Sequence, residues 1–183
     1  MSPEFQQVLD YVEKFKTSAA WQVMVNTVEN SPWHREANVA VHTQMTLDAY
    51  VGMFANDRTE QEQKITMLAL LFHDVGKPTA EEEVTRDDGT VYRRYAGHEQ
   101  SSAIAFVEQY ASDEELRQIV KPIEAHAIRW IIEHHLPYSL GEQKHRALAK
   151  TLAHLCHEIG VSTRVFYDHL CGDTLGRISD NDK

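Results

Sequence analysis

Basic residues are scarce in this sequence. Its 183 residues include 18 lysines and arginines against 28 aspartates and glutamates, which gives a formal net charge of −10. Long nucleic acids are polyanions, and proteins bind them through clustered Lys and Arg. The longest charge run here, Glu81-Glu82-Glu83, is acidic and is predicted to be a solvated face. We therefore expect a small ligand in a local pocket and no long nucleic acid as partner.

Cysteines and long apolar runs are also few. The two cysteines, Cys156 and Cys171, do not form a close metal-type pair and are predicted to be reduced, buried thiols. No apolar run is long enough to cross a bilayer. The N-terminus is acidic and amphipathic, without the basic start and apolar stretch of a secretory signal. We expect a cytoplasmic protein that does not bind membranes.

Helical periodicity dominates the sequence. Ser2-Pro3-Glu4 has the order of a cap, a first-turn proline and a first-turn acid, and Thr59 and Glu62 have capping-box spacing. The segment after Thr59 is apolar nearly all round as far as Phe72, which predicts a buried central helix. Asp88-Gly89, within the polar stretch 79–97, is compatible with a small hairpin. Further helices are expected over about 2–15, 19–28, 38–54, 99–110, 113–120, 122–135, 143–159 and 163–171. We expect one all-α domain over residues 1–183, without repeats or linkers.

Histidine is the unusually abundant residue, with 11 in the chain. Several histidines and aspartates fall at the ends of predicted helices or inside them: His42, His73, Asp74, His98, His134, His135 and Asp173. All are nitrogen or oxygen donors and none is a thiol. Such a set suits Fe, Mn, Ni, Zn, Co or Mg, and it disfavours a structural zinc site, which usually recruits cysteine.

The adjacent pair His73-Asp74 has its own physical logic. Residues one apart on a regular helix do not share a face. At the last, frayed turn, however, both side chains can turn toward one ion. A carboxylate has two oxygens, so Asp74 is also able to bridge two ions. The remaining ligands must come from distant segments, so an ion here would tie several helices together.

The ordered set of donors resembles the HD-domain phosphohydrolase superfamily, whose ligand pattern corresponds here to His42, His73-Asp74 and Asp173. Within the superfamily, the chain is most similar to the HD region of bacterial tRNA nucleotidyltransferases (CCA-adding enzymes) over about residues 30–178. The segments that carry this similarity are Pro32-Trp33-His34 with Glu36, His42-Thr43, His73 to Pro78, Tyr95 to Glu99, and Asp173 to Arg177.

The resemblance implies a helical HD-type bundle with a metal site at its centre. It also implies a second metal site, to which His98 and His134 would contribute, with His135 competing for the place of His134. Whether one or two divalent ions bind is left open. The Gly-Ser followed by paired Asp of the polymerase domain does not precede this region, so CCA addition is not inferred. The implied activity is hydrolysis of a phosphomonoester or a 2′,3′-cyclic phosphodiester of a nucleotide.

The resemblance also suggests roles for individual residues. Asp74, Lys77 and His98 are the candidate catalytic residues. Asp74 would orient the attacking water, and His98 would protonate the leaving oxygen unless it is itself a ligand. Lys77 would contact phosphate, as would Arg177, with pairing to surface acids as the alternative for Arg177. His34 and Glu36 are the remaining candidates, either for substrate binding or for a supporting role behind the metal ligands, with helix capping as their structural alternative.

Two other functions remain open at this point. Some HD proteins use the six-ligand version of the site as a di-iron oxygenase, and others are non-catalytic modules that sense a nucleotide. The apolar first helices are also compatible with a homodimer.

Overall fold

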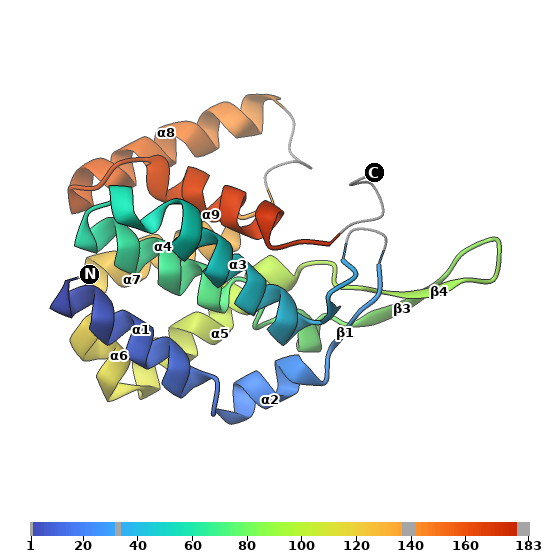
Figure 1. The fold of residues 1–183 in the computed structure, drawn as a ribbon. Coiled ribbons are helices and arrows are strands. Elements are labelled where there is room, and N and C mark those ends of the chain that lie inside the picture. Colours follow the sequence, from blue (N-terminus) through green and yellow to red (C-terminus); the bar gives the residue numbers. More distant parts are fainter. Residues whose placement is uncertain (1, 32–33, 137–141, 179–183) are drawn as a thin grey trace.

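The computed structural model describes residues 2–31, 34–136 and 142–178, which are drawn in colour in Figure 1. Most of these residues are helical, so the predicted all-α class is confirmed. The α-helices are α1 (Pro3–Phe15), α2 (Ala19–Val25), α3 (Val39–Met53), α4 (Glu60–Phe72), α5 (His98–Ser112), α6 (Glu114–Ile119), α7 (Pro122–Glu133), α8 (Glu142–Ile159) and α9 (Arg164–Leu175). Short 3₁₀ turns cover η1 (Ala55–Asp57) and η2 (Lys77–Thr79). The strands are β1 (Val28–Glu29), β2 (Ala37–Asn38), β3 (Glu82–Thr85) and β4 (Val91–Arg94).

Helix α4 lies at the centre of the bundle. It begins with the predicted capping box, in which the Thr59 hydroxyl accepts a hydrogen bond from the Glu62 amide and the Glu62 carboxylate accepts one from the Thr59 amide. Ile65, Leu68 and Leu71 are fully buried. Helices α1, α3, α5, α7 and α9 all pack against α4, as can be followed in Figure 1. The C-terminal end of α4 is therefore carried into the interior.

Helix α9 is longer than expected. The sequence predicted its end at about residue 171, with Asp173 after it, but the helix continues to Leu175. The glycine at position 172 acts as a packing residue and not as a stop signal. A Cβ there would lie 3.2 Å from the Leu70 side chain, so a small residue lets α9 approach α4 closely. Asp173 consequently projects from within the last turns of α9.

The polar stretch between α4 and α5 forms an antiparallel hairpin of β3 and β4, which extends from the bundle in Figure 1. Gly89 turns the chain with a positive φ of 82°. Glu82 lies 2.7 Å from Arg94, and Glu83 lies 2.8 Å from Arg93. The acidic run is exposed, as predicted, and its side chains also pair across the hairpin. The short β1–β2 pair was not predicted.

The structure also bears on the predictions for the two cysteines and for a membrane span. Both cysteines are free thiols, as predicted; Cys156 is buried as expected, whereas Cys171 is only partly buried. Among the described residues, no helix combines the length and the apolar character that a membrane span needs.

Candidate metal centre

The His73-Asp74 pair lies where α4 ends. His73 is the C-cap residue of α4, and both side chains are about 1% exposed. The chain then turns tightly onto α5 at Gly76, whose amide donates a hydrogen bond to the Ser102 hydroxyl. A Cβ at position 76 would lie 2.3 Å from the Ser102 amide nitrogen, so only glycine fits this approach. The close contact fixes the position of the pair relative to α5.

A first group of donors joins three helices. His42 comes from α3, His73 from the end of α4 and Asp173 from α9, and all three are buried. The Nε2 atom of His42 lies 3.1 Å from Asp173 Oδ1 and 3.3 Å from His73 Nε2. Ligands bound at about 2.0–2.2 Å to one ion are ~3.0–3.5 Å apart. The spacing of this group therefore suits a single ion.

A second group lies on the other side of Asp74. His98 Nε2 is 3.1 Å from Asp74 Oδ1 and 3.2 Å from the Nε2 atom of His135. The other oxygen, Asp74 Oδ2, lies 3.1 Å from His73 Nε2 and 3.4 Å from His42 Nε2. Asp74 thus presents one oxygen to each group. This is the bridging arrangement that the sequence allowed for a carboxylate with two oxygens.

The Nδ1 sides of the histidines face backbone carbonyls. His73 Nδ1 is 2.7 Å from Leu70 O, His98 Nδ1 is 2.6 Å from Tyr95 O, and His135 Nδ1 is 2.7 Å from Ile132 O. A carbonyl can only accept, so each Nδ1 carries the proton and each Nε2 presents a lone pair to the cluster. Metal-binding histidines are commonly oriented in this way.

These groups fit a bound cation chemically. The imidazole lone pairs of His98 and His135 face each other at 3.2 Å and repel unless a positive charge lies between them. Both oxygens of Asp74 are buried and lack a hydrogen bond of acceptable geometry within the described chain, although Oδ2 is ion-paired with Lys77 at 2.8 Å. A divalent ion in each group would satisfy both conditions. The donor set of nitrogen and oxygen excludes none of the six metals named above.

Ionisation in the metal-free cluster is uneven. Burial opposes a charge on His42, but Asp173, Glu36 and Asp74 outweigh burial and raise the pKa of His42 to about 10. Burial lowers the pKa of His135 to about 3, helped by the neighbouring His73 and His98. His135 is therefore neutral and ready to bind an ion, whereas His42 holds a proton that an ion must displace.

The two aspartates of the cluster are ionised. Burial raises the pKa of a carboxyl group, but His73 and Lys77 beside Asp74 outweigh burial and hold its pKa well below the usual range. The pKa of Asp173 is likewise held well below its usual range, because His42 and His73 outweigh burial there. Both carboxylates therefore present the charged form that binds a metal.

Lys77 is buried and lies between two carboxylates. Its Nζ atom is 2.5 Å from Glu29 Oε1 and 2.8 Å from Asp74 Oδ2. Burial lowers the pKa of a lysine, but the two carboxylates outweigh burial and raise the pKa of Lys77 above its usual value. Lys77 lines the cavity as expected of a phosphate contact, yet its ammonium already holds Asp74 in place. Glu29 was missed, because no motif surrounds it in the sequence.

A cavity of about 460 Å³ opens onto the cluster. Asp74, Asp173, His98 and His135 lie at its wall, together with Lys77. Its other lining residues are Glu29, Ser31, His34, Tyr92, Arg93, Arg94, Tyr95, Ala96, Gly97, Glu99, Leu136 and Arg177. A larger surface hollow of about 850 Å³, lined by polar residues such as Lys14 and Gln109, lies away from the cluster.

Of the predicted substrate-binding residues His34, Glu36 and Arg177, two line the cavity and one does not. His34 and Arg177 line the cavity. Glu36 does not line it, because its buried carboxylate lies behind His42, with Oε1 3.5 Å from His42 Nδ1. The predicted direct contact between Glu36 and substrate therefore does not match the geometry. Trp33 and Tyr138 lie outside the described residues.

Between the two competing histidines, the structure brings His135 into the cluster. His134 instead stacks on Trp130, with ring centroids 4.3 Å apart, and its Nδ1 atom lies 2.8 Å from Trp130 O. His134 ends α7 and turns away, so its predicted place as a ligand is corrected to His135. Sequence reasoning also missed His169, whose buried ring contacts the rings of His73 and His135. Its position one helical turn before Asp173 was the only available signal.

Comparison with known proteins agrees with this geometry. No curated protein and no solved structure matches the chain. The family model described as HD domain matches residues 39–163, which is more than half of the chain. The match includes His42, the His73-Asp74 pair, His98 and His135. The chain therefore belongs to the HD domain family, whose members are typically metal-dependent phosphohydrolases that bind divalent metals.

Proposed function

We propose that this protein is a metal-dependent phosphohydrolase that acts on a phosphate ester of a nucleotide or a related small molecule. One observation carries the proposal: two donor groups share Asp74 at the wall of a cavity of about 460 Å³. That volume lies in the range of small-molecule sites, about 300–1,000 Å³. The choice of a nucleotide comes from the similarity to the HD region of tRNA nucleotidyltransferases.

The charges around the cluster support a metal requirement. The cluster and its immediate surroundings contain four buried carboxylates, those of Glu29, Glu36, Asp74 and Asp173, and two of them, Glu29 and Asp74, flank the ammonium of Lys77. These negative charges outnumber Lys77 and the protonated His42, so bound cations would favour a phosphate group at the cluster. Divalent ions held by His42, His73, Asp74 and Asp173, and by Asp74, His98 and His135, would supply Lewis acidity that activates water and offsets charge on phosphoryl oxygens.

The chain's own residues then have separate tasks. Asp74 holds the two groups together through its two oxygens, and Lys77 fixes its carboxylate. Arg177 lines the cavity and forms no ion pair with a described residue, so its guanidinium is available to a phosphate oxygen. His34 contacts the substrate from the cavity wall.

His98 is assigned to metal binding and not to proton transfer. Its Nε2 atom faces Asp74 and His135, and its Nδ1–H is donated to Tyr95 O. Neither ring nitrogen is therefore free to protonate a leaving oxygen. The earlier alternative role of His98 as a general acid is not part of the proposal.

A nucleotide panel with metal titration tests the proposal. Metal-free protein is loaded in turn with Mn²⁺, Fe²⁺, Co²⁺, Ni²⁺, Zn²⁺ and Mg²⁺, and inorganic phosphate and nucleoside products are measured. Nucleoside mono-, di- and triphosphates and 2′,3′-cyclic nucleotides serve as substrates, with Asp74→Asn as the inactive control. Absence of turnover on every substrate with every metal would refute the proposed function.

A di-iron oxygenase is the second candidate, because four imidazoles in the two groups provide the nitrogen-rich donor set that iron accepts. Iron-loaded protein would then show mixed-valent iron by electron paramagnetic resonance and would consume O₂. Tight nucleotide binding with neither O₂ uptake nor phosphate release would instead support a sensing module.

A further inference from the structure

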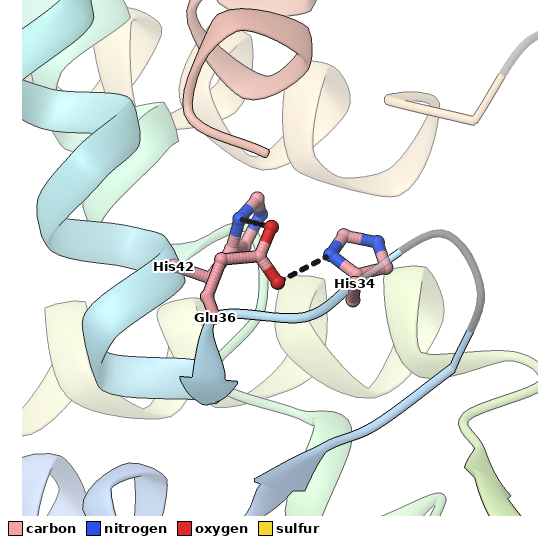
Figure 2. Close-up of side chains that lie close together, drawn as sticks. All are labelled: His34, Glu36 and His42. Carbon is pink, nitrogen blue, oxygen red and sulfur yellow. Dashed lines mark ion pairs between the residues drawn. The ribbon is translucent and has the colours of Figure 1, made fainter. Parts of the chain in front are cut away.

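The carboxylate of Glu36 lies between two imidazoles, as Figure 2 shows. Its Oε1 atom is 3.5 Å from Nδ1 of His42, and its Oε2 atom is 3.5 Å from Nδ1 of His34. Glu36 is 3% exposed and precedes strand β2, whereas His42 lies one turn into α3. One buried carboxylate therefore faces a predicted metal ligand on one side and a residue of the cavity wall on the other.

His42 needs a second acceptor more than the other histidines of the cluster. Its Nδ1 atom lies 3.3 Å from Gly176 O, whereas the corresponding contacts of His73, His98 and His135 measure 2.6–2.7 Å. The longest backbone contact thus belongs to the ligand whose Nδ1 atom has a carboxylate oxygen at 3.5 Å. A charged acceptor strengthens such a bond and fixes the ring orientation.

His34 and Glu36 face each other with unsatisfied polar atoms. Within the described residues, neither His34 Nδ1 nor Glu36 Oε2 has a hydrogen-bond partner of acceptable geometry, and both atoms are buried. Leaving such atoms unpaired is costly, so the two are complementary partners for each other. A proton on Nδ1 would leave Nε2 of His34 as an acceptor on a residue that lines the cavity.

Glu36 is itself held rigidly. The amide of Ile178 donates a hydrogen bond of 2.8 Å to Glu36 Oε1, and the amide of Arg35 donates one of 2.9 Å to Ile178 O. These bonds fix the carboxylate against the segment that follows α9. A rigidly held acceptor transfers its orientation to the groups that it contacts.

We propose that Glu36 is a positioning residue that orients His42 toward the first metal group and His34 toward the substrate. His34 then presents Nε2 as an acceptor, which selects a substrate with a hydroxyl or N–H group close to the phosphate, as in a sugar phosphate. Glu36 contacts neither the metal nor the substrate. The role of His34 rests on the proposed function, whereas the effect of Glu36 on His42 does not.

Calorimetric titration of metal-free protein with Mn²⁺ tests the first half. Groups that hydrogen-bond to metal-binding side chains contribute about 10–100-fold to metal affinity. Glu36→Ala is expected to weaken one of two Mn²⁺ sites by about that factor, and Glu36→Gln by about tenfold. The glutamine variant keeps an acceptor for the Ile178 amide, so it decides the question if the alanine variant does not fold.

Glu99→Gln is the matched control for metal affinity. The Oε2 atom of Glu99 lies 3.8 Å from His98 Nδ1, but that nitrogen already has a contact of 2.6 Å with Tyr95 O. Removing the charge of Glu99 is therefore expected to leave Mn²⁺ affinity unchanged. Equal Mn²⁺ affinity in the wild type and in Glu36→Gln, or an equal loss in Glu99→Gln, would overturn the assignment.

The tautomer of His34 tests the second half without requiring turnover. Long-range ¹H–¹⁵N spectra of the metal-free protein at pH 8, assigned with His34→Ala, are expected to show the Nδ1–H form of His34. Glu36→Gln is expected to shift this ring toward the Nε2–H form. An Nε2–H tautomer in the wild type would overturn the role of Glu36 at His34, whatever the nucleotide panel shows.

Discussion

Asp74→Asn is the substitution that separates a bridged pair of ions from two independent sites. The amide has nearly the same shape as the carboxylate, so packing at the end of α4 is preserved. However, Asp74 Oδ2 faces His73 and His42, and Oδ1 faces His98. Loss of the one shared charge is therefore expected to weaken both sites. Asp173→Asn removes the charge of one ligand in the first group alone.

The size of the effect follows from linkage. A ligand at 100 times its dissociation constant stabilises the folded state by about 2.7 kcal/mol. Two such ions give about 5 kcal/mol, and 1 kcal/mol shifts the melting temperature by about 2–4 °C at this chain length. We expect Mn²⁺ to raise the melting temperature of the wild type by about 10–20 °C, that of Asp173→Asn by about half as much, and that of Asp74→Asn hardly at all.

Differential scanning calorimetry with and without Mn²⁺ measures these shifts. The metal-induced change is compared within each variant, because each substitution also alters the stability of the metal-free protein. An Asp74→Asn variant that gains as much as the wild type would refute the bridging role. An Asp74→Asn variant that keeps half the gain would show that the carboxylate serves one ion only.

Three further predictions concern the same cluster. His135→Ala is expected to lower the bound Mn²⁺ by one ion per chain, measured by elemental analysis, whereas His134→Ala should not; equal stoichiometry in the two variants would contradict the placement of His135. Lys77→Met removes the ammonium that pairs with two buried carboxylates. It is expected to lower the free energy of unfolding of the metal-free protein, measured in urea, by about 3–5 kcal/mol. An unchanged free energy of unfolding would rule out the buried ion pairs. The pKa of His42 is raised to about 10, so an ion must displace a proton from it. Mn²⁺ affinity should therefore rise by up to about tenfold per pH unit between pH 6.5 and 9. Calorimetry in buffers of different ionisation enthalpy should detect about one proton released, and a pH-independent affinity would be incompatible with this ionisation.

Local signals in the sequence were sufficient to predict most of the fold. The cap at Ser2 and the capping box at Thr59 begin α1 and α4 where expected. These helix caps depend only on residues close together in the sequence, so they form whatever the rest of the fold is. The end of α9 was wrong because Gly172 is a stop signal locally but a packing residue against Leu70. Propensity cannot distinguish these roles, since the difference lies in another helix.

The order of histidines and aspartates along the chain was enough to predict most of the cluster. The pattern placed His42, His73, Asp74, His98 and Asp173 in one set, and the structure brings them together. The competing histidines at 134 and 135 were not separable, because a one-residue shift at the end of α7 turns the side chain by about 100°.

Glu29 and Glu36 illustrate what sequence order cannot supply. Glu29 pairs with Lys77 across 48 residues, and Glu36 lies beside His42 through a loop whose path has no periodicity. Both are buried acids in short connecting segments between α2 and α3, where no pattern predicts burial. Glu36 was a site candidate from the sequence, but the partner of each acid followed only from distances.

The ligands also set an order of assembly during synthesis. His42 and Asp173 are separated by 131 residues, yet their donor atoms lie 3.1 Å apart. The first ion therefore cannot find its full set of ligands until the ribosome has released α9 and that helix has docked against α3 and α4. An ion bound there would close a loop that spans most of the polypeptide, as a cross-link does. Metal retention consequently reports that the whole chain, and not merely its central helix, has reached the native topology.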